Sequence, residues 1–276
     1  MVEAMTDGRA LRRLVLPLAC CLGLIAPAAA DTLKAHYVVS LVGLRIGELV
    51  ADGQLEPQSY HMQLSAHLTG LAAMVSSVHM ALASTGTVHK DKYAPMTYAT
   101  SAVNASEMRT LRMALKAGTV KAVEITPPPE YHGERVPVTE ANKRNILDPT
   151  SALIMPVPVA DSLVGPAACE RTLPIYDGYA RFDIALHYVG TRDVEVAGYS
   201  GPVSVCSARY MPISGHLVNS RSTAFMAQND GIEVWLVPIP HAHVVVPLKV
   251  SMPTMAGQLE IEATDFDVSG VPETTH

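Results

Sequence analysis

Apolar and polar side chains alternate along much of this chain, and this period of two restricts it to a fold built from β-strands. Between Tyr60 and Leu68 every second residue is apolar, and the residues between them are His, Gln or Ser. Successive side chains of a strand point to opposite faces, so such a segment buries one face and leaves the other wetter. The same rhythm recurs at 37–41, 111–115, 182–188 and 259–263.

Two Asp-Gly pairs indicate how the strands are joined. Asp177-Gly178 and Asp230-Gly231 each lie between apolar runs, and such pairs supply the positive backbone φ angles that tight hairpins need. Neighbouring strands are therefore expected to be antiparallel. The prediction is an all-β fold in which residues 31–276 form a single domain with one strongly curved antiparallel sheet, as an open barrel or in a clam-like form.

Two segments depart from the alternation and predict two short helices. Leu71, Met74, Val75 and Val78 follow the spacing of one apolar helical stripe. Asp148 before Pro149 has the character of a helix N-cap followed by Pro at the first helical position. Between these segments, the three prolines at 127–129 predict a stiff extended connection, interpreted as a joint within the curved sheet.

The first thirty residues have the layout of a cleaved signal peptide. Basic residues up to Arg13 precede an apolar run, and Ala28 to Ala30 provide small residues before Asp31. A retained membrane anchor fits less well because Pro17 interrupts a run that is already short for a span. We therefore expect residues 1–30 to be removed and the protein to lie in the periplasm of a Gram-negative bacterium, an address compatible with outer-membrane association.

Charge and cysteine usage narrow the function further. The chain carries 20 Lys and Arg against 26 Asp and Glu, and this acidic balance argues against a nucleic-acid partner. Outside the leader only Cys169 and Cys206 remain. In an oxidising compartment two such cysteines predict one disulfide, and they lack the close spacing of a redox-active pair.

An ordered series of motifs resembles a bacterial family of exported proteins catalogued as domain of unknown function 3108. The series covers nearly all of the chain beyond the leader and consists of Tyr37 to Gly47, the stretch 135–154 ending in Asp148-Pro149-Thr150-Ser151, Cys169 with Ile175 to Gly178, Cys206 with Tyr210 and Pro212, and Val246 to Gly257. The resemblance implies an envelope protein and supplies no catalytic residues. A looser similarity of expected shape links the chain to the periplasmic lipoprotein carriers of the Lol system.

Catalytic and metal-binding patterns are weak. Gly198 to Gly201 fails as a nucleophile elbow because Pro202 takes the place of the second Gly. His241 and His243 are two residues apart and would face the same way on a strand, but no third metal ligand can be named. We therefore expect no catalytic site, metal or cofactor.

The remaining candidates concern binding. The stripe Leu71, Met74, Val75 and Val78 either fills the core or lines an apolar cavity, and Arg135, Lys143 and Arg144 could contact a phosphate or lipid headgroup. The leading hypothesis is a non-enzymatic periplasmic protein that binds or carries a lipid or another apolar envelope component. The alternatives are a structural or interaction protein that contacts other envelope proteins and, third, a hydrolase of envelope polymers. The protein is not expected to be an integral membrane protein after cleavage.

Overall fold

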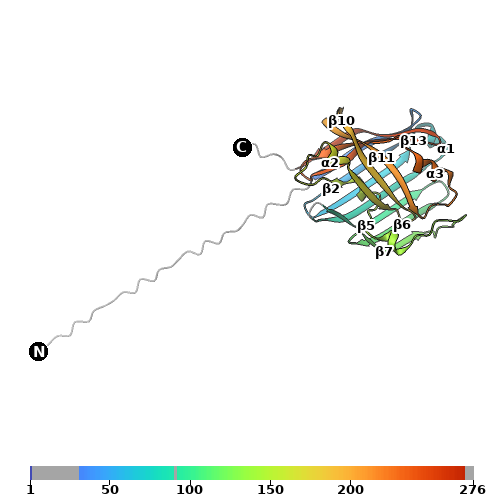
Figure 1. The fold of residues 1–276 in the computed structure, drawn as a ribbon, viewed down its shortest axis with the longest axis horizontal. Helices are drawn as coiled ribbons and strands as arrows, with labels where there is room; N and C mark the ends of the chain where they lie inside the picture. Colours follow the sequence, from blue (N-terminus) through green and yellow to red (C-terminus); the bar gives the residue numbers. More distant parts are fainter. Residues whose placement is uncertain (2–30, 90–91, 271–276) are drawn as a thin grey trace.

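One antiparallel sheet dominates the computed structural model, which describes Met1 and residues 31–89 and 92–270 (Figure 1). The predicted leader lies outside the described residues, apart from Met1. The sheet has 14 strands, and this confirms the all-β prediction. The strands are β1 (Asp31–Leu41), β2 (Leu44–Leu55), β3 (Ser59–Leu68), β4 (His79–His89), β5 (Lys92–Val103), β6 (Met108–Lys116), β7 (Thr119–Thr126), β8 (Met155–Pro156), β9 (Arg171–Tyr176), β10 (Arg181–Val196), β11 (Tyr199–Ser214), β12 (Ile232–Ile239), β13 (Val244–Thr254) and β14 (Gly257–Ser269).

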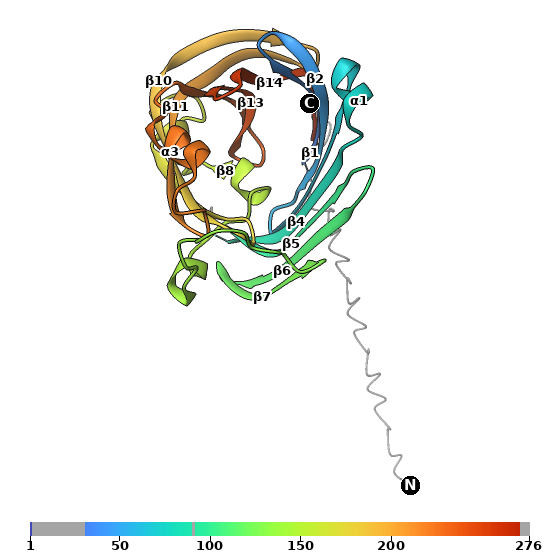
Figure 2. The same cartoon turned by 90° about the vertical axis from the view of Figure 1, so that its right-hand side faces the viewer.

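The first and last strands of the sequence pair in the middle of the sheet. From β1 the sheet runs through β2 to β7 on one side, and from β14 it runs through β13, β12, β11 and β10 to β9 on the other. The sheet curves into a ring (Figure 2), but β7 and β9 remain its two edges. Main-chain hydrogen bonds at 146–147 bridge part of the gap: Ile146 N donates to Gly118 O at 3.0 Å, and Leu147 N donates to Pro174 O at 2.7 Å.

The interior of the ring is filled by chain segments as well as by side chains. Figure 2 shows β8 and part of the β12–β13 hairpin inside the ring. Val244 and Val245 are adjacent and both fully buried, and Leu236 and Val237 on the partner strand are buried as well. A strand that is buried on both faces has consecutive apolar residues, and this explains the sequence Val244-Val245-Val246.

The helices are few and short. They are α1 (Gly70–Val75), α2 (Pro166–Cys169), α3 (Arg221–Gln228) and the 3-10 turns η1 (Glu140–Lys143) and η2 (Ser151–Leu153). The helix predicted from the stripe beginning at Leu71 is confirmed as α1. The helix predicted after Asp148 is only the 3-10 turn η2, whose N-cap is Thr150. None of the helices in the described part of the chain is long and apolar enough to span a bilayer.

Helices α2 and α3 were not predicted, although the sequence contains signals for both. Pro166 occupies the first turn of α2, where the missing N–H of proline costs nothing. The side chain of Ser220 accepts a hydrogen bond from Thr223 N at 3.1 Å and so caps α3.

The two Asp-Gly predictions had different outcomes. Asp177-Gly178 does lie in the β9–β10 hairpin: Gly178 has a φ of 98°, and Asp177 Oδ1 accepts the N–H of Ala180 at 2.6 Å. Asp230-Gly231 joins α3 to β12 and is not a hairpin turn, so that prediction was wrong. The three prolines at 127–129 follow the edge strand β7 and begin the connection that leads to β8 and to the other edge strand, β9.

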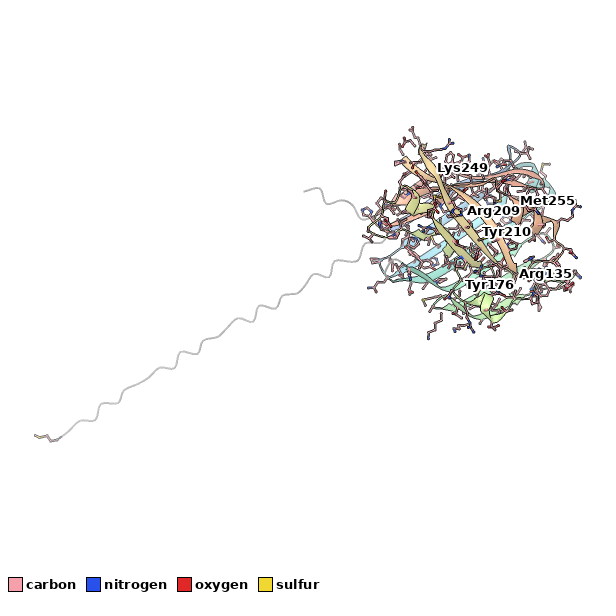
Figure 3. The ribbon with its side chains drawn as sticks, in the orientation of Figure 1. Arg135, Tyr176, Arg209, Tyr210, Lys249 and Met255 are labelled. Atoms are coloured by element: carbon pink, nitrogen blue, oxygen red, sulfur yellow. A yellow bond between two sulfur atoms is a disulfide. The ribbon has the colours of Figure 1, made fainter. Side chains whose placement is uncertain are left out.

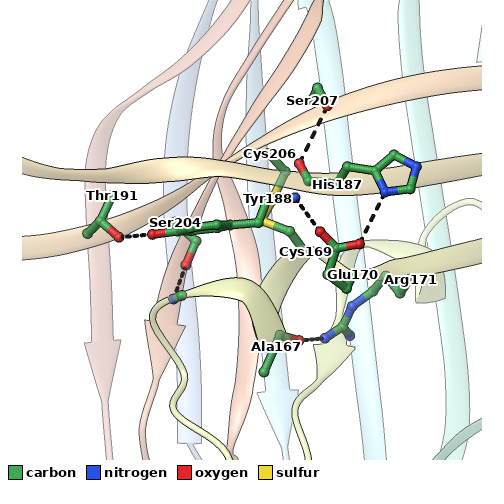
Figure 4. The surroundings of a disulfide bond; sticks show 11 residues. Ala167, Cys169, Glu170, Arg171, His187, Tyr188, Thr191, Ser204, Cys206 and Ser207 are labelled. Carbon is green, nitrogen blue, oxygen red and sulfur yellow. Dashed lines mark hydrogen bonds and ion pairs between the residues drawn. A yellow bond between two sulfur atoms is a disulfide. The ribbon is translucent and has the colours of Figure 1, made fainter.

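The predicted disulfide is present. Cys169 at the end of α2 and Cys206 on β11 are bonded, with their Cα atoms 5.6 Å apart (Figure 4). The neighbouring Glu170 accepts the N–H of Tyr188 at 2.9 Å, and Arg171 donates to Ala167 O at 2.6 Å. The bond therefore fastens the connection between β8 and β9 to the inner strands of the second half of the sheet.

Candidate functional site

The inner face of β1, β2 and β3 encloses one side of an apolar cavity. Its volume is about 110 Å³, and it opens partly to solvent. Leu33, Tyr37, Ala51, Met62 and Leu64 form the wall on these three strands. The lining continues on the neighbouring strands with Ile261 on β14, which pairs with β1, and with Val246, Pro247, Lys249 and Val250 on β13, and Leu153 of η2 also lines the space.

A second apolar hollow of about 160 Å³ continues along the same strands. Val39, Gly47 and Ala66 line this hollow. Each lies two residues beyond a residue that lines the cavity, namely Tyr37, Leu49 or Leu64. Two residues of a strand span about 7 Å and return to the same face. The two spaces therefore form an apolar track on the inner face, which runs from the buried cavity toward the end of the ring where α1 lies.

Tyr37 and Lys249 border the cavity with polar groups that already have partners. The hydroxyl of Tyr37 donates to Pro247 O at 2.8 Å, and burial raises the pKa of this tyrosine. Lys249 Nζ lies 3.0 Å from a carboxylate oxygen of Glu262 and 3.7 Å from one of Glu260. The aliphatic stem of Lys249 can thus line the cavity while its charge is neutralised beside it.

A buried polar cluster holds η2 against the inner face. Asp148 Oδ1 accepts the N–H groups of Thr150 and Ser151 at 3.0 and 2.9 Å. Its Oδ2 accepts the hydroxyls of Ser84 and Ser151 at 2.9 and 2.5 Å. The hydroxyl of Tyr60 lies 2.7 Å from Ser151 Oγ. Because Ser151 donates to Asp148, Tyr60 donates to Ser151, and the five groups form one connected network.

This cluster is structural and does not contact solvent. Asp148, Ser84 and Ser151 are fully buried, and Tyr60 nearly so. Burial raises the pKa of Asp148, although the four hydrogen bonds to its carboxylate lower it in part. A substrate cannot reach an acid and hydroxyls that the fold encloses, and the arrangement instead positions Leu153, two residues after Ser151, at the cavity.

The predicted apolar stripe is divided between two environments. Figure 2 shows α1 outside the ring of strands, and the side chain of Met74 is 82% exposed. Val78 lies beyond α1 and does line the outer hollow. Met74 therefore does not line an enclosed cavity, whereas Val78 forms part of the track. The side chains of Leu71 and Val75 lie outside what the structure describes, so their part of the prediction stays untested.

Two of the three basic residues proposed for a headgroup, Arg135 and Lys143, have separate partners. Arg135 donates to Gly215 O at 2.6 Å, and its guanidinium carbon lies 4.9 Å from the ring centre of Tyr131. Lys143 forms an ion pair with Glu140 at 2.9 Å, and Arg144 is exposed. Since these contacts already occupy Arg135 and Lys143, the geometry lends no support to a shared anion site.

His241 and His243 lie in the turn between β12 and β13, not on a strand, so the strand placement was wrong. His241 Nδ1 lies 3.5 Å from Asp31 Oδ1, while His243 Nε2 lies 3.1 Å from Pro158 O. The turn allows the two rings to take different partners. Within residues 31–89 and 92–270, no three His, Cys, Asp or Glu side chains are grouped as metal ligands.

Most of the residues that line the cavity escaped the sequence-based search. The alternation does place Met62 and Leu64 on one face of β3 and Tyr37 on one face of β1. That pattern identifies which side chains point inward. It cannot show that these side chains leave space between them, because the rest of the lining comes largely from strands more than 180 residues later in the chain.

Comparison with known proteins gives a family and similarity to solved structures. The sequence model of a family described as "Protein of unknown function (DUF3108)" matches residues 35–264. The crystal structure of a beta-barrel-like protein of the domain of unknown function DUF1849 from Brucella abortus is similar over 86% of this chain and 98% of that chain, with 10% sequence identity and a TM-score of 0.47. No curated protein matches the chain.

Proposed function

The chain belongs to the DUF3108 family of proteins of unknown function, and from this premise we propose that it is a non-enzymatic binding or carrier protein for an apolar molecule of the bacterial cell envelope. The ligand site is the apolar track on the inner face of β1, β2 and β3. The protein would act in the periplasm after removal of residues 1–30.

The alignment of the cavity and the outer hollow along the same three strands is the observation that carries this proposal. Apolar residues at successive inward positions of the same three strands contribute to the lining of both the cavity and the outer hollow, beside Lys249 in the cavity and Glu48 and His67 at the hollow. Apolar side chains that face an unfilled space lack packing partners there. A ligand that fills the space supplies these contacts and removes the apolar surface from water. A narrow apolar chain laid along the track would remove both sets of side chains from water.

The size of the cavity limits the ligand. Sites for drug-sized molecules have volumes of about 300 to 1,000 Å³, whereas the cavity holds about 110 Å³. A single acyl chain that enters from the hollow fits this constraint better than a wide ring system. Leu153 is the residue best placed to control the volume, since it projects from the short turn η2.

The disulfide and the leader support the envelope part of the proposal. A bond between Cys169 and Cys206 persists in an oxidising compartment and is rare in the cytosol. The leader pattern of residues 1–30 predicts export to the same kind of compartment. Fractionation of the native host cells followed by N-terminal sequencing tests this part: the periplasmic protein should begin at Asp31.

Filling the track should weaken binding of an apolar chain. We expect Ala51→Leu in the cavity and Ala66→Leu in the hollow each to lower the affinity for cis-parinaric acid, a linear fluorescent fatty acid, by about tenfold. Each change adds three carbon atoms, which take the space of about three methylene groups of the probe; at about 0.8 kcal/mol each, this is about 2.4 kcal/mol, more than a tenfold loss requires. Leu153→Ala, which enlarges the cavity, should instead bind the probe at least as tightly as the unchanged protein.

A matched variant separates the track from the rest of the surface. Ala81 lies on β4 and is exposed on the outer face, so Ala81→Leu should leave the affinity unchanged. Thermal unfolding of each variant establishes that it is folded. Equal affinity for Ala51→Leu and Ala81→Leu, or no binding by the unchanged protein, would contradict the proposed site.

A further inference from the structure

Large apolar side chains are exposed at one end of the ring. The β1–β2 turn, the connection containing α1 and the β13–β14 turn all lie at this end, because the strands that they join are antiparallel neighbours. Figure 1 places α1 and α3 together at this end, and Figure 3 places Met255 there. Asp31 and Gly270 lie at the opposite end. There Asp31 pairs with Leu55 and lies beside the β12–β13 turn.

We call four of these side chains the apolar rim: Val42, Leu44, Met74 and Met255. Their exposed fractions are 64%, 68%, 82% and 58%. Backbone contacts join the elements that carry them. Val42 N donates to Gln258 O at 2.8 Å, just after the turn of Met255, and Thr69 N at the start of α1 donates to Ile46 O at 3.0 Å. The four side chains therefore project from adjoining connections.

Val42 is exposed at a backbone position that disfavours it. Val42 and Gly43 have φ angles of 51° and 76°, and both angles are positive as in a tight type I′ turn, where Asn-Gly is the preferred pair. A β-branched residue at positive φ is unusual because its Cβ crowds the backbone. The side chain of Val42 lies beside Gly257 and is 64% exposed, so a role for this valine lies at the surface and not in the core.

The surface around the rim carries little charge. From Pro57 to His89 the chain contains no Asp, Glu, Lys or Arg, although Asp and Glu exceed Lys and Arg by six in the whole sequence. This tract includes β3, α1 and β4. The charged residue next to the rim, Arg45, forms an ion pair with Glu48 at 2.6 Å. The α1 side of the rim thus carries no formal charge, and the charged residues at the same end, in the β5–β6 turn, form an ion pair between Glu107 and Arg109.

These features favour a lipid bilayer over a protein partner. A stable protein interface buries roughly 800 Å² on each partner in a continuous, complementary patch. Four side chains on three separate connections do not make such a patch, whereas the fluid apolar part of a bilayer can receive each side chain separately. The outer hollow is lined by Gly47 and Val78, which flank the β2 and α1 parts of the rim, so the track opens on the same side.

We propose that the apolar rim docks on a lipid bilayer and inserts its side chains between the lipid headgroups. Apolar side chains drive the insertion, so that binding does not depend on anionic lipid. The inference goes beyond the proposed ligand, because the rim would hold the protein at a membrane whatever the track contains. It also gives the track an orientation, with its open end toward the lipid.

Flotation with vesicles of phosphatidylcholine, and with vesicles of phosphatidylethanolamine and phosphatidylglycerol, tests the docking. The unchanged protein should float with both. Val42→Asn should raise Tm by about 2 to 4 °C, since asparagine tolerates the positive φ, and yet lower vesicle binding about tenfold, as expected for one apolar side chain lost from the bilayer. The double variant Val42→Asn/Leu44→Ser should bind more weakly still.

Val159→Asn/Val189→Ser is the matched control, because these valines are 70% and 61% exposed and lie away from the rim. It should float like the unchanged protein, as should Ala51→Leu, whose defect is in the track alone. The proposal is overturned if the unchanged protein does not bind vesicles, if the control loses as much binding as the rim variant, or if binding requires phosphatidylglycerol. It is also overturned if sedimentation shows that Val42→Asn breaks a dimer, which would make the rim a contact between copies.

Discussion

Removing the disulfide by Cys206→Ala should lower the free energy of unfolding by about 3 to 4 kcal/mol. The bond joins residues 37 positions apart, and a closed loop of this length restricts the unfolded chain far more than the folded one. Both sulfur-bearing side chains are fully buried, so the change also removes packing around α2. Chemical denaturation followed by the fluorescence of Trp235, the one tryptophan in the sequence, measures the effect.

The double variant Cys169→Ala/Cys206→Ala serves as the control for the unpaired thiol left by the single change. It should be destabilised to the same extent, because the loss comes from the bond and not from a free cysteine. Reduction of the unchanged protein should approach the stability of the double variant. A difference below about 1 kcal/mol between oxidised and reduced protein would show that the bond contributes little.

Asp148→Ala should destabilise the protein by at least about 3 kcal/mol. The carboxylate accepts the N–H groups of Thr150 and Ser151 and the hydroxyls of Ser84 and Ser151. A buried donor that loses its partner costs about 1 to 3 kcal/mol. Because η2 is held by these bonds, Leu153 should also lose its fixed position, and limited proteolysis should cut the chain near 151–154.

Asp161→Ala, in the connection that follows β8, provides a comparison, since Asp161 is exposed. Its effect on the free energy of unfolding should stay within about 0.5 kcal/mol. If the two alanine variants were equally stable, the buried cluster could not be what holds η2 in place.

The same carboxyl predicts a dependence of stability on pH. Burial raises the pKa of Asp148 in the folded protein above its unfolded value, which is about 3.9 for aspartate. Between these two values the folded state binds more protons than the unfolded state, so this group lowers the stability as the pH rises through the interval. Asp148→Asn has no such titration. The unchanged protein should therefore gain stability relative to Asp148→Asn as the pH falls toward about 4, as thermal unfolding at several pH values would measure. A constant difference would exclude the effect.

The prediction of the strands was reliable because it depended on local chemistry. The alternation from Tyr60 to Leu68 became β3 with Tyr60, Met62 and Leu64 buried. The prediction after Asp148 was less accurate for a tertiary reason. Asp148 and Pro149 would suit a helix start in isolation, but the carboxylate and the hydroxyl of Ser151 are drawn into a network with Ser84 and Tyr60, and the turn ends at Leu153.

The histidines and the apolar stripe show the same limit at the candidate site. Spacing alone made His241 and His243 neighbours on one face, yet they lie in a turn and contact Asp31 and Pro158, which are remote in sequence. The stripe around Met74 has the pattern of a packed helix, but α1 places Met74 in solvent at the apolar rim. The spacing of residues predicts the direction of a side chain relative to its own helix or strand. It does not predict which other element that side chain meets.

Local sequence determined the strands of this protein, because the period of two decides which residues face inward on each strand. The two cysteines outside the leader also identified the disulfide, although only the fold brings them together. Only the tertiary structure decided where the cavity and the rim lie. The cavity exists because the curved run of strands from β3 through β1 and β14 to β13 bends around η2, and its volume is the space that their side chains leave unfilled. The rim exists because antiparallel pairing brings the turns of Val42 and Met255 and the helix of Met74 to one end. Packing and pairing of distant segments depend on the whole chain, and no local pattern specifies them.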